Sequence, residues 1–324
     1  MTGLHRVRLA LGAALLSVAG AAFAQAPDTR PIRVLVGFPP GGSTDVVARL
    51  LSDKLRDTLG RSVIVENKPG NGGQVAAVQL KGSAPDGTTL MLTIDHTHVI
   101  IPLTFKEPGY DPVKDFTPVI GVAQYFNAMA ASGASNVKSV QEMSAFVKAN
   151  PSQANFGIPA PGSVPQFAGL VVAKAMGVTM TPIPYKGGAP LVQDLLGGQV
   201  PLGFGSLTEM LDHHRAGKLR VLAVSGTARA RSAPEIPTFE ELGLKGIDKN
   251  PWLAFVGPAG LPPAFVQRFN QAVRAAMDAA DVKARFATIG IEPTPTTPEG
   301  LRGWIVDATN HWGPVIKESG YQLQ

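Results

Sequence analysis

The fold of this chain is constrained most by residues 32–50. A short apolar run meets a Pro/Gly turn, and a helix-period apolar pattern begins directly after Ser43 and Thr44. This order predicts a strand, a tight loop and the N-terminus of a helix. Gly41 and Gly42 leave the loop backbone bare, and the N–H groups and dipole of the helix favour a negative group there. On local pattern, the loop is either an anion site or an ordinary helix cap after a glycine turn.

Strands and helices are expected to alternate along the rest of the chain. The strand-like segments are residues 32–38, 63–67, 89–94, 119–131, 155–158, 181–185, 202–205, 220–225 and 252–256. The helix-like segments are residues 44–59, 74–81, 139–149, 165–176, 187–196, 209–216, 263–280, 281–288 and 298–319. Such alternation predicts an α/β fold with mostly parallel sheets that are flanked by helices.

Two irregular connections, at residues 106–118 and 228–250, divide this pattern. They predict one domain from residues 26–125 plus 251–324 and a second from residues 126–250. Two crossings between the domains would form a hinge and leave a cleft. Because ligands of open α/β sheets bind at the carboxyl ends of the strands, the glycine-rich loops after Phe38 and Ile158 are expected to line that cleft.

Residues 1–24 have the organisation of a secretory signal peptide. A basic segment with Arg6 and Arg8 precedes an apolar run, and Ala22-Phe23-Ala24 has the form of a cleavage site. The alternative is a membrane anchor, but the apolar run is shorter than the roughly 20 residues that a spanning helix needs. We therefore expect an exported, periplasmic protein.

The composition argues against several classes of function. Removing Arg6 and Arg8 from the 29 basic residues leaves 27 against 24 acidic ones, a net charge of +3. Since the basic residues are scattered, nucleic-acid binding is not expected. The chain has no cysteine, so it carries neither disulfides nor thiol chemistry.

Other loops offer weaker candidates. Residues 70–73 are either a second backbone nest for an anion or a simple glycine turn into a helix. His96 follows a strand and is a candidate ligand contact. His96 and His98 could also ligate a metal, but no third and fourth ligand is evident, so no metal is expected. No cofactor is expected either.

Catalysis is not indicated. Ser163 does not lie in a G-x-S-x-G elbow, and no histidine is placed as its base. We interpret Ser163 as a helix cap that faces the cleft. Gly188, at the start of the helix at residues 187–196, is another candidate contact. No nucleophile or base with an orienting partner is found, so the chain is not expected to be an enzyme.

An ordered series of motifs resembles the solute receptors of the tripartite tricarboxylate transporter family, of the Bordetella uptake gene type. The motifs are FPPGGSTD at 38–45, VENKPGNGG at 65–73, APDGT at 84–88, KDFTPV at 114–119, PYKGGAP at 184–190, DLLGGQ at 194–199 and PTF at 237–239. The resemblance covers essentially the whole mature chain. It implies a two-domain periplasmic-binding fold, type II-like, that closes on a small carboxylate and delivers it to a membrane permease. It also implies that the first glycine-rich loop holds one carboxylate through backbone N–H groups and waters.

The chain departs from the family's pattern at the far end of the cleft. The second-domain loop is apolar at Ile158 and Pro161, and Gly205-Ser206 stands where the family often has a polar or acidic residue. A ligand with one carboxylate and an apolar body is therefore expected. The ligand-binding residues expected from the sequence are Pro40, Gly41, Gly42, Ser43, Thr44, Asp45, His96, Gly162, Ser163, Gly188 and Ser206.

The predicted function is that of a periplasmic carboxylate receptor, expected to be a monomer, that works by hinge closure. The alternative is a sensor that passes its liganded state to a membrane receptor kinase, since the same cleft would serve both functions.

Overall fold

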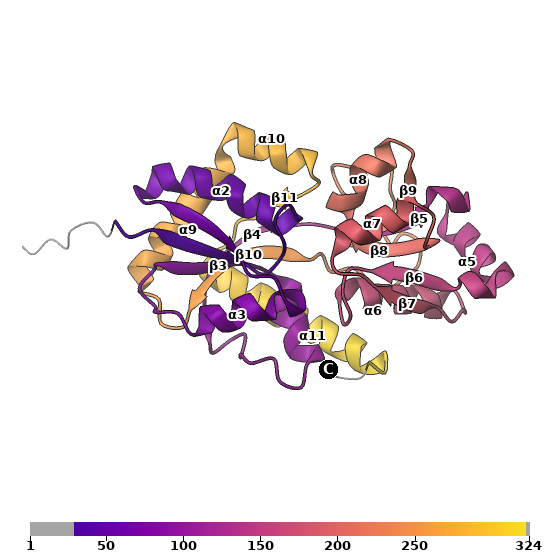
Figure 1. Cartoon of the computed structure of the whole chain (residues 1–324), viewed down its shortest axis with the longest axis horizontal. Helices are drawn as coiled ribbons and strands as arrows, with labels where there is room; N and C mark the ends of the chain where they lie inside the picture. Colours follow the sequence, from indigo (N-terminus) through magenta and orange to yellow (C-terminus); the bar gives the residue numbers. More distant parts are fainter. Residues whose placement is uncertain (1–28, 322–324) are drawn as a thin grey trace, which may run out of the picture.

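A computed structural model describes residues 29–321, and the expected signal peptide lies outside them. The chain forms two lobes, each with a central sheet between helices (Figure 1). No helix within residues 29–321 has the length and apolar character needed to cross a membrane.

The first lobe contains a six-stranded sheet in the order β11-β4-β10-β3-β1-β2. Its strands are β1 (Ile32–Val36), β2 (Val63–Asn67), β3 (Thr89–Ile94), β4 (Phe116–Gln124), β10 (Trp252–Pro258) and β11 (Glu292–Pro293). Strands β1, β2 and β3 are parallel, whereas β10 runs antiparallel to its neighbours β3 and β4. Strand β11 runs antiparallel to β4.

Helices cover both faces of this sheet. One core joins it to α2 (Ser43–Leu59), α9 (Pro263–Asp278) and α10 (Ala280–Thr288). The other core joins it to α3 (Gln74–Lys81), η2 (His96–Ile100), α4 (Ile101–Thr104) and α11 (Pro298–Glu318). The apolar face of α2, with Val47, Leu51 and Leu55 fully buried, illustrates the 3.6-residue period that predicted this helix.

The second lobe contains a five-stranded sheet in the order β7-β6-β8-β5-β9. Its strands are β5 (Asn127–Ser132), β6 (Asn155–Ile158), β7 (Thr181–Pro184), β8 (Leu202–Ser206) and β9 (Leu219–Val224). Helices α5 (Val140–Ala149) and α6 (Val164–Ala175) share one core, and α7 (Gly188–Leu196) and α8 (Leu207–Arg215) share the other. Short turns of 3-10 helix are η1 (Asn71–Gly73), η3 (Gly133–Ser135) and η4 (Pro151–Gln153).

The expected two-domain α/β class is confirmed, with mixed sheets. The predicted strand at residues 119–131 is two strands, and the break at Tyr125 and Phe126 is where the chain passes from one sheet to the other. Strand β10 returns from the second lobe and therefore runs against β3 and β4. Helical turns at residues 96–104 were not predicted, because their sequence carries neither a cap nor an amphipathic period.

Strand directions make the carboxyl ends of both sheets face each other. Strand β4 runs parallel to β3 and leads directly into the second lobe, so the loops after β1, β2 and β3 lie on the side that faces that lobe. In the second lobe, Ser206 at the end of β8 pairs with Asn127 at the start of β5. The carboxyl end of β8 therefore adjoins the crossing, and the Leu207 N–H donates to the Phe126 carbonyl at 2.8 Å.

The two crossings are held together by hydrogen bonds. The Tyr125 N–H donates to the Pro251 carbonyl at 3.0 Å. The buried Ser225 hydroxyl accepts from the Asn127 N–H at 2.9 Å and donates to Asn250 Oδ1 at 2.8 Å. One hydroxyl thus connects both crossing segments to the end of β9.

Replacing Ser225 by alanine should weaken this connection. Ser225→Ala leaves the buried Asn127 N–H without its acceptor, and we expect the free energy of unfolding to fall by about 1–3 kcal/mol. Urea denaturation measures the change. Ser152→Ala, at an exposed serine of the same lobe, is the control and should change stability by less than about 0.5 kcal/mol. Equal losses in the two variants would contradict this role of Ser225.

Candidate functional site

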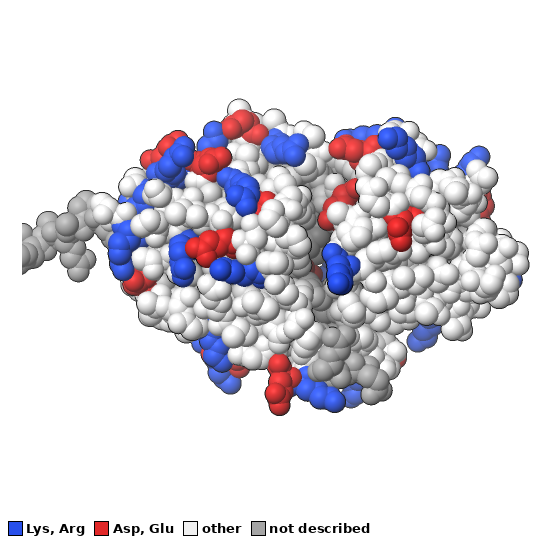
Figure 2. All heavy atoms as spheres, in the orientation of Figure 1, with Lys and Arg blue, Asp and Glu red and all other residues white. Residues whose placement is uncertain are grey.

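The candidate site is the groove between the two lobes. Figure 2 shows this groove as a depression that separates the lobes along one face of the molecule. The carboxyl ends of both sheets adjoin it, as the strand directions require. Each expected ligand contact can therefore be tested by asking whether its donors and acceptors are free or already used within the protein.

The β1–α2 loop is held in shape by the carboxylate of Asp45. Its oxygens accept from the Gly41 N–H at 2.9 Å, from two nitrogens of Arg49 at 2.9 and 3.0 Å, and from Asn67 Nδ2 at 2.8 Å. Asn67 Nδ2 also donates to the Phe38 carbonyl at 3.0 Å. Gly41 has a φ of 84°, a conformation that other residues rarely adopt, so the loop needs glycine there.

Asp45 is charged despite its burial. Burial opposes the charge, but the hydrogen bonds from Arg49, Gly41 and Asn67 together lower the pKa of Asp45 below its usual value. Four donors occupy both of its oxygens, so no acceptor position remains for a ligand. The expected ligand contacts at Asp45 and at the Gly41 N–H are therefore corrected: both groups bind each other and position the loop.

The first turn of α2 offers unused donors. Its N-cap residue is Gly42, and no side chain caps the helix. Within the described residues, no acceptor bonds the backbone N–H groups of Ser43, Thr44 and Asp45; the first helical bond is from the Val46 N–H to the Gly42 carbonyl at 3.0 Å. Unsatisfied N–H groups at a helix N-terminus attract anions through their partial charges and the helix dipole.

Three loops at the carboxyl ends of β1, β2 and β3 pack closely through glycines. A Cβ on Gly37 would collide with Gly73, and a Cβ on Gly72 would collide with the ring of His96. His96 is half-buried, and its Nδ1 has no partner among the described residues. Burial lowers the pKa of His96 to about 4, so the ring is neutral at pH 7. His96 thus lies beside the glycine loop at Gly72, and its contact with a ligand stays a prediction.

Two expected contacts from the second lobe are used internally. The Gly162 N–H donates to Gln166 Oε1 at 2.7 Å, and the Ser163 hydroxyl donates to the Ala160 carbonyl at 2.7 Å. A Cβ on Gly162 would meet Tyr321 and Thr104 of the first lobe. These two donors are therefore used within the protein, the loop packs against the first lobe, and a ligand contact at Gly162 or Ser163 stays a prediction.

Neighbouring side chains lie against both Gly188 and Ser206. Ser206 caps α8, and its hydroxyl lies 2.7 Å from that of Thr208. Gly188 is buried, and the carboxyl group of Glu209 lies directly over it, in the space that a Cβ would need. Glu209 therefore lies between Gly188 and its surroundings, and a ligand contact at Gly188 stays a prediction. The far side of the groove is more polar than the sequence indicated.

Tyr125 was not singled out from the sequence, although it lies at the crossing between the lobes. Its pKa is raised well above the usual value, first by burial and then by the charges of Asp95 and Glu209. Asp95 and Glu209 thus both act on Tyr125 through their charges. Burial also raises the pKa of Asp95 to about 7, against backbone hydrogen bonds that include those from His96 and Trp252.

A signal for two of these residues exists in the sequence. Asp95 directly follows a buried strand, and Glu209 stands in the first helical turn after β8, so both lie at carboxyl ends of strands. Tyr125 gives no such signal, because a tyrosine inside an apolar run is usually a packing residue.

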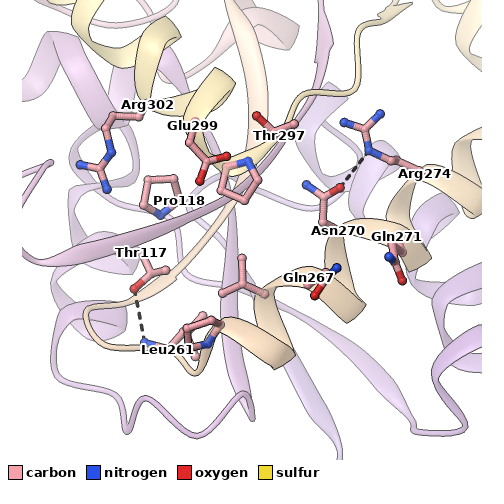
Figure 3. A pocket seen from close by; sticks show the side chains of 13 residues that line it. Thr117, Pro118, Leu261, Gln267, Asn270, Gln271, Arg274, Thr297, Glu299 and Arg302 are labelled. Carbon is pink, nitrogen blue, oxygen red and sulfur yellow. Dashed lines mark hydrogen bonds between the residues drawn. The ribbon is translucent and has the colours of Figure 1, made fainter.

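The structure has two further cavities. The larger is not lined by Tyr125, Asp95 or Glu209, and the smaller is lined by Asp95 alone of these three. A cavity of about 780 Å³ is formed by β4, α9 and α11, with Arg274 and Arg302 on opposite sides (Figure 3). Arg274 donates to Asn270 Oδ1 at 2.8 Å. A smaller cavity of about 260 Å³ reaches Asp95 from the second crossing, near Asn250. Within residues 29–321, no three His, Asp or Glu side chains group to hold a metal ion.

Comparison with known proteins identifies the family. The family model described as "Tripartite tricarboxylate transporter family receptor" matches residues 47–321. The chain belongs to this receptor family. The resemblance seen in its motifs is thereby confirmed, and both the family description and the solved relative BugD are those of receptors or binding proteins.

Three relatives illustrate the likeness of this receptor to others. BugT of Bordetella pertussis is 34% identical over 320 residues, which cover 98% of each chain. The solved structure of the periplasmic binding protein BugD has a TM-score of 0.84 and 31% identity, over 92% of this chain and 100% of that one. The Rhodopseudomonas palustris protein Rpa4515, solved with adipate, has a TM-score of 0.85 and 30% identity, over 91% and 99%.

Neutralising Asp45 should destabilise the receptor in a pH-dependent way. Because the folded state lowers the pKa of Asp45, the charge stabilises the fold at neutral pH, and this contribution disappears as pH falls through the folded-state pKa. We expect Asp45→Asn to lower the melting temperature at pH 7, and the difference from wild type to shrink as pH falls below about 4. Thermal denaturation followed by circular dichroism measures both.

Asp53→Asn is the matched control. Asp53 lies on the same helix, is exposed, and makes no ion pair with a described residue. A similar loss in this variant would contradict the role of Asp45, as would an Asp45→Asn difference that stays constant down to pH 3.

Proposed function

We propose that this protein is a periplasmic receptor that binds a small organic carboxylate in the groove between its lobes. The unused N–H groups at the N-terminus of α2 carry the proposal. They lie at the carboxyl end of β1, on the side of the first lobe that faces the second. The Asp45 network fixes the loop before a ligand arrives, so binding does not have to order it.

In this proposal, the N–H groups of Ser43 and Thr44 bind the ligand carboxylate, with the hydroxyls of both residues as further donors. Pro40, Gly41 and Gly42 form the loop wall beside it. Arg49 is paired with Asp45 and is not available as a counter-ion. The carboxylate is therefore held by backbone dipoles rather than by a full positive charge.

His96 bounds the same end of the groove. Since its ring is neutral at pH 7, it acts as a hydrogen-bonding group without adding charge. Ser206 lies across the groove at the N-terminus of α8 and is retained as a secondary contact.

We further propose residues 26–125 with 251–324 and residues 126–250 as the two domains, which close on the ligand about the crossings near Tyr125 and Asn250. The chain would be exported through a cleavable signal peptide, act as a monomer without catalysis, and deliver its ligand to a membrane permease. Two observations support this proposal. The chain belongs to a transporter receptor family, and the structure of its relative Rpa4515 was solved with adipate, a carboxylate.

A thermal-shift screen over mono-, di- and tricarboxylates tests the ligand class, because a ligand that binds only the folded state raises its melting temperature. Calorimetry with the best carboxylate then compares two variants. Ser43→Ala removes only the hydroxyl, whereas Ser43→Pro also removes the N–H. Proline is tolerated at the first helical position, and Gly42, with φ −71° and ψ 164°, already has the extended conformation that proline requires before it.

We expect Ser43→Pro to bind the carboxylate at least tenfold more weakly than Ser43→Ala, while both variants keep a melting temperature near that of wild type. Equal affinities would show that the Ser43 N–H does not contact the ligand. A screen in which no carboxylate stabilises the protein would overturn the proposed function.

A further inference from the structure

Glu209 has an unusual position for an acidic residue in a carboxylate receptor. It lies in the first turn of α8, which begins directly after the carboxyl end of β8. The Leu207 N–H at the start of this helix donates to the Phe126 carbonyl in the crossing between the lobes. Glu209 is half-buried, and its position in the first turn of α8 places it beside the carboxyl end of β8.

The carboxyl group of Glu209 contacts α7 without capping it. It lies over Gly188, the first residue of α7, so closely that no other residue type fits there. A carboxylate at this place could accept from the helix N-terminus, but the N-cap of α7, Gly187, receives no side-chain hydrogen bond. A structural role as a helix cap is therefore not realised.

No other partner uses this carboxyl group. In the described part of the chain, Glu209 forms neither an ion pair nor a side-chain hydrogen bond. Burial raises the pKa of Glu209 to about 7, and no cation nearby lowers it. The Glu209 carboxylate is partly desolvated and has no protein donor, so a donor on a ligand that covers it would stabilise its charge.

Glu209 also interacts with Tyr125. The charges of Glu209 and Asp95 both raise the pKa of this tyrosine. Tyr125 is half-buried at the crossing between the lobes, and no described residue accepts from its hydroxyl. The first lobe thus offers N–H donors for an anion at α2, and the second lobe offers the acidic group of Glu209.

We propose that Glu209 determines the ligand class: a carboxylate whose distal end carries a hydrogen-bond donor, preferably an ammonium group, and not a second carboxylate. This inference rests on the proposed function, in which α2 binds the ligand carboxylate. A distal ammonium group would supply the donor that Glu209 lacks, whereas a distal carboxylate would meet a like charge.

Ligands that differ only in the distal group test this inference. Three series suffice: 4-aminobutyrate, succinate and butyrate; 6-aminohexanoate, adipate and hexanoate; and 8-aminooctanoate, suberate and octanoate. Calorimetry at pH 7 measures each with wild type, with Glu209→Gln and with Glu240→Gln. Glu240 is an exposed residue of the same lobe without a side-chain partner among the described residues, which makes it the matched control.

In at least one series, wild type should bind the amino acid at least tenfold more tightly than the matching dicarboxylate, with the simple monocarboxylate between them. Glu209→Gln should weaken binding of the amino acid at least tenfold and strengthen binding of the dicarboxylate, so that the difference in affinity between the two ligands is lost. Its melting temperature should equal or exceed that of wild type, because a buried charge is removed. Glu240→Gln should change none of these values.

Three results would overturn the inference. If carboxylates bind but Glu209→Gln leaves the order of their affinities unchanged, Glu209 does not determine the ligand class, and the proposed function stands. If the dicarboxylate binds wild type most tightly and Glu209→Gln weakens it, Glu209 is a donor in its protonated form instead. Binding of none of the nine ligands would overturn the carboxylate role itself, and this inference with it.

Discussion

The directions of β10 and β5 determine what every loop of this receptor faces. Strand β10 runs against β3 and β4, and β5 runs against β8 and β9. The carboxyl ends of the remaining long strands therefore meet across the two crossings. The hydrogen bonds of Ser225 and the pairing of Asn127 with Ser206 keep the second sheet in register with the crossings. The groove, its glycine loops and its acidic far side all follow from this arrangement of strands.

Electrostatics within the groove depends on which charges are already neutralised. Asp45 and Arg49 neutralise each other and fix the first loop, so its only attraction for an anion comes from backbone N–H groups. Asp95 and Glu209 form no ion pair within residues 29–321, and burial makes their charges costly. The α2 loop thus attracts an anion from the first lobe, whereas Glu209 adds an acidic group from the second lobe. Such polarity favours a particular orientation of an elongated ligand.

Local patterns predicted most of the elements but not the use of each polar group. Strands β2, β3 and β6 and helix α3 have the bounds expected from the sequence, because apolar period and glycine turns define them. The sequence could not reveal that Asp45 binds Gly41 and Asn67, or that Gly162 packs against Tyr321. These contacts join residues through the fold, and a single sequence carries no record of them. Glu209 was overlooked because its place over Gly188 depends on how α7 and α8 pack.

The position of β10 in the first sheet also affects the order in which the chain can acquire structure. Strand β10 lies between β3 and β4, yet it follows the whole second lobe along the chain. Until residues 252–258 are available, β4 has no partner through which to join β3. The strands of the second sheet come from one continuous segment, residues 127–224, whereas the first sheet is complete only when the end of the chain is available. Emergence from a ribosome or a membrane channel would thus yield the second lobe first, followed by the lobe that begins the sequence.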